Sequence, residues 1–415
     1  MRTVLPMTVV RPVVSLGQSA VMVLVRAGSL HDPAGQTGIA HFIEHMMFRD
    51  GGGSGEHRLL QAFRLVGTMN AWTDSDHTLY YIQVPDGHAV EAIGLLVGMA
   101  FRARLPLSQA DLRAERKVVL EEYKALVAQP ETAMLWKLQQ HVFEGHPMSR
   151  TGISDRFEYG RSEIQEFVAR HYRPENSHLV VCTSLPGTVV RQAAALAVRR
   201  VGVRVRVRAP VVPVPVPVPV PGFVCASGKL PRRYEIPGRK GQGGVAIGFP
   251  VRRPRTLRDS LALDMVAFIA GGCSPVNELF RVLRLENDLV YGADSTVSGV
   301  SDGWCMFTAH CLVDSHNADA DRAEKIMTSV LKSTPQKEQF DVYKEHMLNS
   351  IRCSIAASAQ DYSQFQVTQL MRAGTAVPHG TLFETLESLS YLDVEKAARG
   401  ALVFDSRCVV VRMNA

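Results

Sequence analysis

Two histidines and a glutamate in the stretch HFIEHMMF, residues 41–48, are the first candidates for chemistry. His41 and His45 are four residues apart, and on a helix this spacing places both imidazoles on one face, where they can share a metal ion. Glu44 would lie beside that ion, where a carboxylate can accept a proton from a metal-activated water. The order HxxEH is the inverted form of the HExxH zinc motif. A short motif of this kind also occurs by chance on the apolar face of a helix, so the interpretation requires a further ligand.

A third ligand is expected on another helix, because a catalytic zinc site has three protein ligands and one open position. The stretch QADLRAERKVVLEEYKAL, residues 109–126, predicts such a helix. Glu115 and Glu122 are seven residues apart and therefore share one of its faces. Three apolar residues mark much of its buried side: Val118, Val119 and Leu126.

The composition is that of an ordinary globular protein. The chain has 415 residues, enough for roughly two to three domains, and 46% of them are hydrophobic. The formal net charge is +6, and much of the excess lies in the arginine-rich stretch 199–208. Aromatic residues are not interleaved there, so a solvated basic edge is favoured over nucleic-acid binding.

Cysteine usage and hydropathy indicate the compartment. The seven cysteines form no CxxC pair, and the first 181 residues contain none, which is typical of a reducing environment. The N-terminal stretch, residues 1–29, predicts strands broken by Pro12 and Gly17 rather than a signal peptide. Apolar runs fall short of the ~18–20 residues that a membrane span needs. We therefore expect a cytoplasmic protein with neither nucleic acid nor membrane as a partner.

The clearest break in the chain is APVVPVPVPVPVPG, residues 209–222. Alternating prolines remove backbone donors and fix φ, which excludes a helix or a central strand and predicts an extended, polyproline-like spacer. A ligand for an SH3-type domain is the alternative, but flanking selectivity residues are missing. We expect an N-terminal domain at 1–200, a Pro-Val linker at 201–222 and a C-terminal domain at 223–415.

The two halves of the chain repeat one order of elements. Each contains a strand, a helix, a glycine-rich loop, a second helix, a pair of hairpin strands and a further helix, which indicates an internal duplication of about 200 residues. Long alternating strands mixed with helices predict an α+β fold, with a mostly antiparallel sheet packed with helices in each half. After a shift of about 220 residues, the first motif falls on Leu261, Asp264 and Met265, so the second copy cannot bind metal in the same way.

The spacing of these groups resembles that of the M16 family of zinc peptidases, which includes pitrilysin, insulin-degrading enzyme and the mitochondrial processing peptidase. HxxEH is followed after 69 residues by Glu115 and after six more by Glu122. The resemblance covers nearly the whole chain. AGSLHDPAGQTGIAHFIEHMMF is similar to the first strand and zinc helix of the family, ERKVVLEEYK to its third-ligand helix, NAWTDSDHTLYY to its Asn-Ala-aromatic-Thr strand and HYRPENSHLVV to the end of its first domain. It implies two homologous domains that form one half-shell of a clamshell chamber.

The resemblance implies a role for each matching polar residue. His41, His45 and Glu122 resemble the ligands of one zinc ion per chain. Glu44 resembles the general base that activates the water, and Glu115 resembles a carboxylate that orients a ligand histidine.

Neighbouring positions carry weaker assignments. Glu121 is the rival third ligand by adjacency, but on a helix it points about 100° away from the next residue, which the family spacing selects. Asn70 and Ala71 resemble residues that hold the substrate backbone beside the metal. Phe48 and Trp72 resemble apolar pocket walls, and a place in the core is an equal alternative for both.

The resemblance also implies an arginine and, seven residues later, a tyrosine in the second domain, where they stabilise the negative charge of a tetrahedral intermediate. LRLENDLVYG supplies Arg284 and Tyr291 at that spacing, and a surface arginine with a strand tyrosine is the alternative. In two-domain members, the first domain of one chain faces the second domain of another. A homodimer is therefore the expected assembly, and a heterodimer with an M16-like partner is the alternative.

The implied function is a zinc endopeptidase that hydrolyses short or unfolded peptides in a closed dimeric chamber, where the substrate adds a strand to a sheet edge. A non-catalytic structural subunit is one alternative, against which the complete ligand set argues. A zinc-stabilised binding module is another, against which three ligands instead of four argue. RDGGGSG at 49–55, AGGCSP at 270–275 and LENDLV at 285–290 depart from the family pattern, in segments that concern substrate contacts rather than zinc chemistry.

Overall fold

The chain folds into two compact units, each of which draws segments from both halves of the sequence. The computed structural model describes residues 3–12, 17–49, 58–102, 105, 107–201, 205–208, 232–238, 242–272, 277–301, 303–313 and 317–414. Unit 1 comprises Met1–Tyr123, Thr151–Pro215 and Arg352–Val377. Unit 2 comprises Lys124–Arg150, Val216–Ile351 and Pro378–Ala415.

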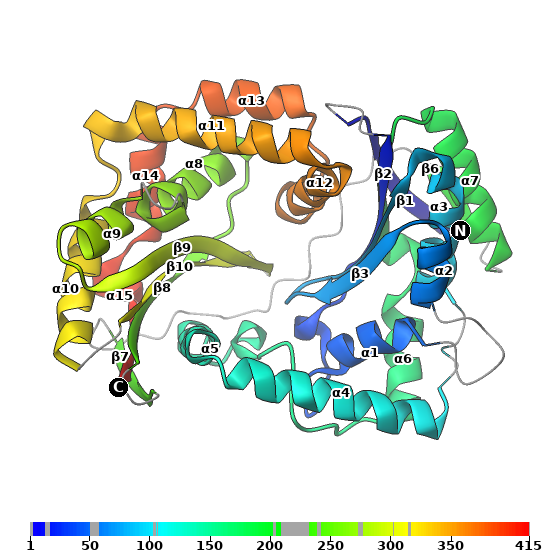
Figure 1. Ribbon diagram of the computed structural model, residues 1–415, viewed down its shortest axis with the longest axis horizontal. Coiled ribbons are helices and arrows are strands. Elements are labelled where there is room, and N and C mark those ends of the chain that lie inside the picture. Colours follow the sequence, from blue (N-terminus) through cyan, green and yellow to red (C-terminus); the bar gives the residue numbers. More distant parts are fainter. Residues whose placement is uncertain are drawn as a thin grey trace. The chain divides into compact units, whose positions relative to one another are not determined.

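Unit 1 is built on a six-stranded sheet (Figure 1). Its strands are β1 (Thr3–Val10), β2 (Gln18–Val25), β3 (Thr68–Thr73), β4 (Thr78–Pro85), β5 (Ser177–Cys182) and β6 (Val205–Arg208). They lie in the order β3-β4-β2-β5-β1-β6, antiparallel from β3 to β5 and parallel from β5 to β6. The two edge strands are thus β3, which follows the first motif, and β6, which belongs to the arginine-rich stretch.

Unit 2 repeats this topology with five strands. They are β7 (Arg232–Pro237), β8 (Gly243–Arg252), β9 (Val290–Ser301), β10 (Trp304–Val313) and β11 (Val409–Asn414). Their order, β9-β10-β8-β11-β7, matches β3-β4-β2-β5-β1 strand by strand, and the last pair is parallel in both. The predicted α+β fold with two homologous domains is therefore confirmed. The conformation of the predicted Pro-Val linker lies outside the described residues, apart from Val201 and β6.

Helices cover both faces of the first sheet. They are α1 (Ile39–Met47), α2 (Arg58–Arg64), α3 (Ala89–Ala100), α4 (Gln109–Val127), α6 (Arg161–His171), α7 (Gly187–Arg200) and α12 (Ala359–Ala373). Met22 and Leu24 of β2 pack against Val367 and Leu370 of α12. Because side chains alternate along a strand, the intervening residues of β2 face the other side, where α3 and α7 lie (Figure 1).

The second sheet is covered by α5 (Pro130–Val142), α8 (Leu257–Ala267), α9 (Glu278–Phe280), α10 (Asn317–Ser333), α11 (Phe340–Ala357), α13 (His379–Glu387), α14 (Tyr391–Ala401) and α15 (Phe404–Arg407). Helix α5 comes from the first half of the sequence and packs on β8 and β11, just as α12 from the second half packs on β2 and β5. Helix α5 packs close to Gly248, since a Cβ on this residue would come 3.0 Å from the side chain of Leu138 and would require that side chain to shift.

The structure shows which residues of α4 are buried and whether any described helix could span a membrane. Val119 of α4 is buried, but Val118 is 48% exposed, so the sequence-based assignment of Val118 to the buried side is wrong. The two valines are adjacent, and on a helix adjacent residues point about 100° apart. Among the described residues, no helix is long and apolar enough to cross a membrane.

Candidate metal centre

The helix that carries the two histidines begins at a glycine. Gly38, the residue before α1, has φ 88°, a left-handed conformation that glycine adopts without strain. The Asp32 carboxylate accepts hydrogen bonds from the backbone N–H groups of Gly38, at 2.6 Å, and Ala40, at 3.1 Å, and so satisfies the first turn of the helix. Phe42 and Ile43 bury the opposite side of α1, which leaves the histidines half-buried on the accessible side.

Three donor groups converge beside α1. The Nε2 atoms of His41 and His45 lie 3.7 and 3.3 Å from the carboxylate oxygens of Glu122, which α4 presents. One ligand atom from each of these three residues lies within 4.8 Å of the others, as binding to one ion requires. Glu121, the rival third ligand, is exposed and does not belong to this cluster. The structure thus brings together His41, His45 and Glu122, the residues that the family resemblance implies as ligands.

Glu115 orients the His45 ring through its Nδ1 atom. Its Oε1 lies 2.8 Å from Nδ1 of His45. Its Oε2 accepts a hydrogen bond of 2.7 Å from Nε of Arg49 and forms an ion pair of 2.6 Å with Nη2 of the same guanidinium. Burial alone would raise the pKa of Glu115, but the hydrogen bond from His45 and the charge of Arg49 hold it below its usual value. A charged Glu115 fixes Nδ1 of His45 as the donor and leaves Nε2 for a metal.

Glu44 lies beside this cluster and is largely shielded from solvent. Its side chain is almost buried, at 7% exposure, and burial raises its pKa to about 7. The hydroxyl of Thr73, at the end of β3, donates a hydrogen bond of 2.7 Å to Oε2 of Glu44. The carboxylate is therefore held in one orientation beside the three donor groups.

The pKa values of the two histidines are shifted in opposite directions. Burial lowers the pKa of His41 to about 4, and its Nδ1 is buried with no partner among the described residues. Burial also opposes the charged form of His45, but hydrogen bonds to Glu115 and Glu122 outweigh it and raise the pKa to about 9. Two imidazole nitrogens and one carboxylate are the donor types of a catalytic zinc site. The residues therefore fit a zinc ion.

The sequence of the chain matches models of two known protein domains. The profile described as "Insulinase (Peptidase family M16)" matches residues 14–156, which include the whole metal cluster. The profile described as "Peptidase M16 inactive domain" matches residues 159–347. The chain belongs to the M16 family of peptidases.

Individual M16 proteins are similar to this chain at low identity. The "Uncharacterized zinc protease YmxG" of Bacillus subtilis is 22% identical over 386 residues, which span 91% of this chain and 88% of that protein. The "Probable mitochondrial-processing peptidase subunit beta" of Schizosaccharomyces pombe is 26% identical over 161 residues, which span 38% of this chain and 35% of that protein. A protease from Helicobacter pylori of known crystal structure has a TM-score of 0.84 at 19% identity, covering 99% of this chain and 96% of its own.

In the part of the second M16 domain that the structure describes, no cluster of metal donors is found. Helix α8, which occupies in unit 2 the place of α1, carries buried Leu261 and Met265 where α1 carries histidines. Arg284 follows α9, and its Nη1 donates a hydrogen bond of 2.6 Å to Oδ1 of Asp288. Tyr291 begins the exposed part of β9, and its side chain is 86% exposed. Both side chains are thus accessible in unit 2.

The residues expected to contact substrate lie on or near β3. Asn70 and Ala71 are on this edge strand, which pairs with β4 on one side only, and Oδ1 of Asn70 accepts a hydrogen bond of 2.9 Å from the Ala71 N–H. The Trp72 ring packs 5.6 Å from that of Tyr81 and against the core beneath α12. The Phe48 ring lies 6.4 Å from that of Tyr80. Both Phe48 and Trp72 are half-buried, so they contact the core and keep one accessible side.

Sequence reasoning missed two members of the site, Arg49 and Thr73. Arg49 follows His45 by four residues, a spacing that was visible in the sequence, although α1 ends at Met47, two residues before it. Thr73 ends the Asn-Ala-aromatic-Thr stretch, but its partner Glu44 is 29 residues away. A contact over that separation depends on how β3 packs beside α1, which local spacing does not reveal.

Proposed function

We propose that the chain is a zinc-dependent endopeptidase that hydrolyses short or unfolded peptides. The observation that carries this proposal is the convergence of His41, His45 and Glu122 beside an almost buried Glu44. The names of M16 relatives, which include zinc proteases, support the same metal and the same class of reaction.

The metal would be held by Nε2 of His41, Nε2 of His45 and the Glu122 carboxylate, one ion per chain. A zinc ion in such a site supplies Lewis acidity, which lowers the pKa of water and polarises a carbonyl group. Glu115 and Arg49 orient His45 for this task, because their hydrogen bonds leave only its Nε2 free to bind. His41 contributes a neutral imidazole, since burial already disfavours its charged form.

Glu44 would act as the general base and then as the general acid. Its carboxylate accepts a proton from the attacking water as the new C–O bond forms at the scissile carbonyl. It then gives this proton to the leaving amine as the C–N bond breaks, so the carboxylate is restored at the end of the cycle. Thr73 keeps the reacting carboxylate oriented between these two steps.

The substrate would lie as an added strand along β3. This edge strand offers unpaired backbone groups next to the metal cluster, and an extended peptide can pair with them. Asn70 and Ala71 would hold the peptide backbone, while the accessible sides of Phe48 and Trp72 would contact apolar side chains. Only a flexible peptide can adopt this extended form, which favours short or unfolded substrates over folded proteins.

Arg284 and Tyr291 would stabilise the negative charge that develops on the carbonyl oxygen. Tyr291 is exposed and Arg284 is partly exposed, and both belong to the second M16 domain. We propose that a homodimer forms a closed chamber and that these two residues serve the zinc site of the other chain. A heterodimer with a metal-free M16 partner is the second candidate, since one relative is named as the beta subunit of a processing peptidase.

The proposal is tested by hydrolysis of an unstructured, internally quenched peptide by the chain purified alone. We expect turnover that stops when a chelator removes zinc and returns when one equivalent of zinc is added back. Zinc content by mass spectrometry should change in parallel with the rate. Activity that persists in protein shown to be free of metal would exclude a zinc mechanism.

A further inference from the structure

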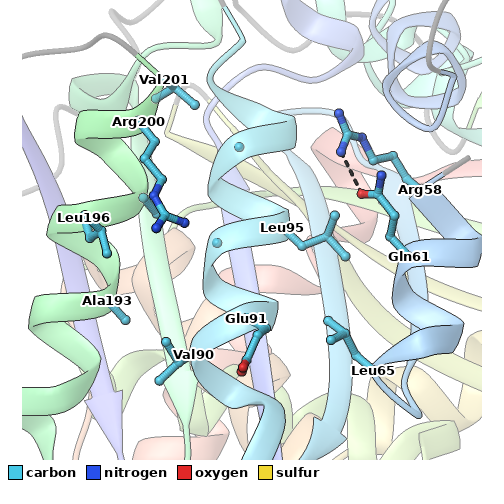
Figure 2. Close-up of a pocket in the computed structure, with 13 residues that line it drawn as sticks. Arg58, Gln61, Leu65, Val90, Glu91, Leu95, Ala193, Leu196, Arg200 and Val201 are labelled. Atoms are coloured by element: carbon cyan, nitrogen blue, oxygen red, sulfur yellow. Dashed lines mark hydrogen bonds between the residues drawn. The ribbon is translucent and has the colours of Figure 1, made fainter. Parts of the chain in front are cut away.

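A groove on unit 1 has no part in the chemistry proposed above. It runs along α3 between α2 and α7 and has a volume of about 630 Å³ (Figure 2). It belongs to the helical layer on the face of the sheet opposite to α12 (Figure 1). Much of its wall is apolar: Leu65, Val90, Leu95, Leu196 and Val201.

The floor of the groove is a bare stretch of helix backbone. Gly94 and Gly98 are one turn apart on α3 and both line the groove. Glycine weakens a helix relative to alanine, so two of them in a 12-residue helix carry a cost. A Cβ on either residue would meet no atom of the described residues within 4 Å, so their packing does not require glycine there. The absence of side chains at these two positions instead lets another molecule approach the α3 backbone closely.

The two ends of the groove carry opposite charges. Arg200 on α7 and Arg58 on α2 flank the C-terminal part of α3, and Glu91 lies in its first turn (Figure 2). The Arg58 guanidinium is oriented by a hydrogen bond of 2.7 Å from Nη1 to Oε1 of Gln61. An occupant that complements this pattern has acidic groups at the arginine end and a basic group at the Glu91 end.

Exposed apolar side chains occur on all three helices around the groove. Val90 and Leu196 on its walls are 41% and 49% exposed, and Phe63 on α2 is 77% exposed. Of the seven residues of α2, Ala62 is the one that is buried. Contiguous exposed apolar side chains mark surfaces that a partner covers.

We propose that this groove binds an amphipathic helix of a partner protein. Helices α2 and α7 bound a trough whose lining on α3 runs from Val90 to Gly98, about 12 Å along the helix axis, which suits about two turns of a helical rod better than a flat membrane surface. The apolar face of the bound helix lies over Gly94 and Gly98, with its acidic end at Arg58 and Arg200. The opposite charges at the two ends set its direction.

A matched variant separates binding from folding. In G94A/G98A the added methyl groups occupy the floor of the groove, while the open space around them and the better helix propensity of alanine leave α3 intact. We expect this variant to melt several degrees higher than the wild-type chain and to bind the partner helix at least tenfold more weakly. A purely structural effect of the glycines would not produce both changes together.

The probe is a displayed library of 14-residue helices with one apolar face and randomised charged positions. Selection uses the full-length E44Q chain, so that peptides are not hydrolysed, and counter-selection uses E44Q/G94A/G98A. We expect enriched helices that carry acidic residues at one end and a basic residue at the other, with affinities measured by fluorescence anisotropy of the synthetic peptides. R200E should weaken binding at least tenfold, and exchange of the peptide's acidic residues for lysine should restore it.

Three results would overturn the proposal. The first is selected helices that bind E44Q and E44Q/G94A/G98A equally, or without regard to charge. The second is concentration-dependent dimerisation in sedimentation experiments that G94A/G98A abolishes, which would identify a second copy of the chain as the occupant. The third is groove-dependent flotation with vesicles of phosphatidylcholine and phosphatidylglycerol, which would identify a membrane.

Discussion

At the scale of single residues, the site consists of chemically active groups and the groups that hold them. Glu44 and His45 each have a dedicated partner on another element, Thr73 on β3 and Glu115 on α4. Thr73 is itself held in place, since its hydroxyl lies 3.4 Å from that of Thr78, which donates to the backbone carbonyl of Ala27. The orientation of the base thus depends on the hairpin β3–β4.

This arrangement predicts the effect of replacing Thr73. T73V keeps the shape of the side chain but removes the hydroxyl, so Glu44 loses its fixed orientation. We expect kcat to fall about tenfold or more with KM nearly unchanged, because the loss concerns proton transfer rather than peptide binding. Steady-state kinetics on the quenched peptide test this.

T73S is the matched control, since it keeps the hydroxyl and should retain most of the wild-type kcat. Equal turnover of T73V and T73S, at equal zinc content, would mean that the hydrogen bond to Glu44 has no catalytic role.

At the scale of elements, the interior strand β5 carries a buried histidine. His178 lies on β5 between β1 and β2, and its Nε2 is 2.8 Å from the hydroxyl of Thr8 on β1. Burial lowers the pKa of His178 to about 3, compared with 6.5 for a solvated histidine. The unfolded chain therefore takes up a proton at a pH where the folded chain does not.

The sign of the pH effect follows from this difference. The stabilisation is fully present above pH 6.5 and is lost progressively as the pH falls from 6.5 toward 3. We expect His178 alone to reduce the free energy of unfolding by about 2 kcal/mol between pH 7 and pH 5. The measurement compares urea unfolding of the wild type and H178Q at both pH values, because glutamine can keep the bond to Thr8 without titrating. An equal pH effect on both proteins would contradict the prediction.

Local patterns explain which parts of the molecule could be predicted. The pairing of His41 with His45 and of Glu115 with Glu122 follows from helical spacing alone, and the repeated order of elements was visible in the two halves. The packing of α5 on the second sheet and of α12 on the first sheet could not be predicted in this way. An apolar helix face does not specify which of two similar sheets it covers. The close packing of Leu138 in α5 against Gly248 likewise joins two residues that are more than a hundred positions apart in the sequence. The spacing of residues along the sequence does not encode such long-range contacts.

At the scale of the whole molecule, the proposed assembly divides each active site between two chains. The zinc set would come from unit 1 of one chain and the Arg284–Tyr291 pair from unit 2 of the other. Such a division makes complementation possible, because two chains with different defects can form one intact site in a mixed dimer.

We therefore predict the result of mixing E44Q with R284A. Each variant alone should be impaired, E44Q nearly completely and R284A about tenfold to a thousandfold, the range for a lost oxyanion donor. After dissociation and reassembly at equal amounts, about half of the dimers are mixed and each has one intact site, so activity should rise to about a quarter of the wild type. A mixture no more active than the average of its two components would show that the site is not shared between copies of this chain.

The most direct test of the central claim is the turnover of E44Q loaded with one equivalent of zinc. Glu44 lies next to the ligands without being one of them, so its replacement should leave the metal in place and remove the proton transfer. We predict zinc content equal to that of the wild type and hydrolysis of the quenched peptide reduced by at least about a hundredfold, the scale of general acid–base catalysis. Substantial turnover by the zinc-loaded variant would contradict the assignment of Glu44 as the base and, with it, the mechanism proposed for this chain.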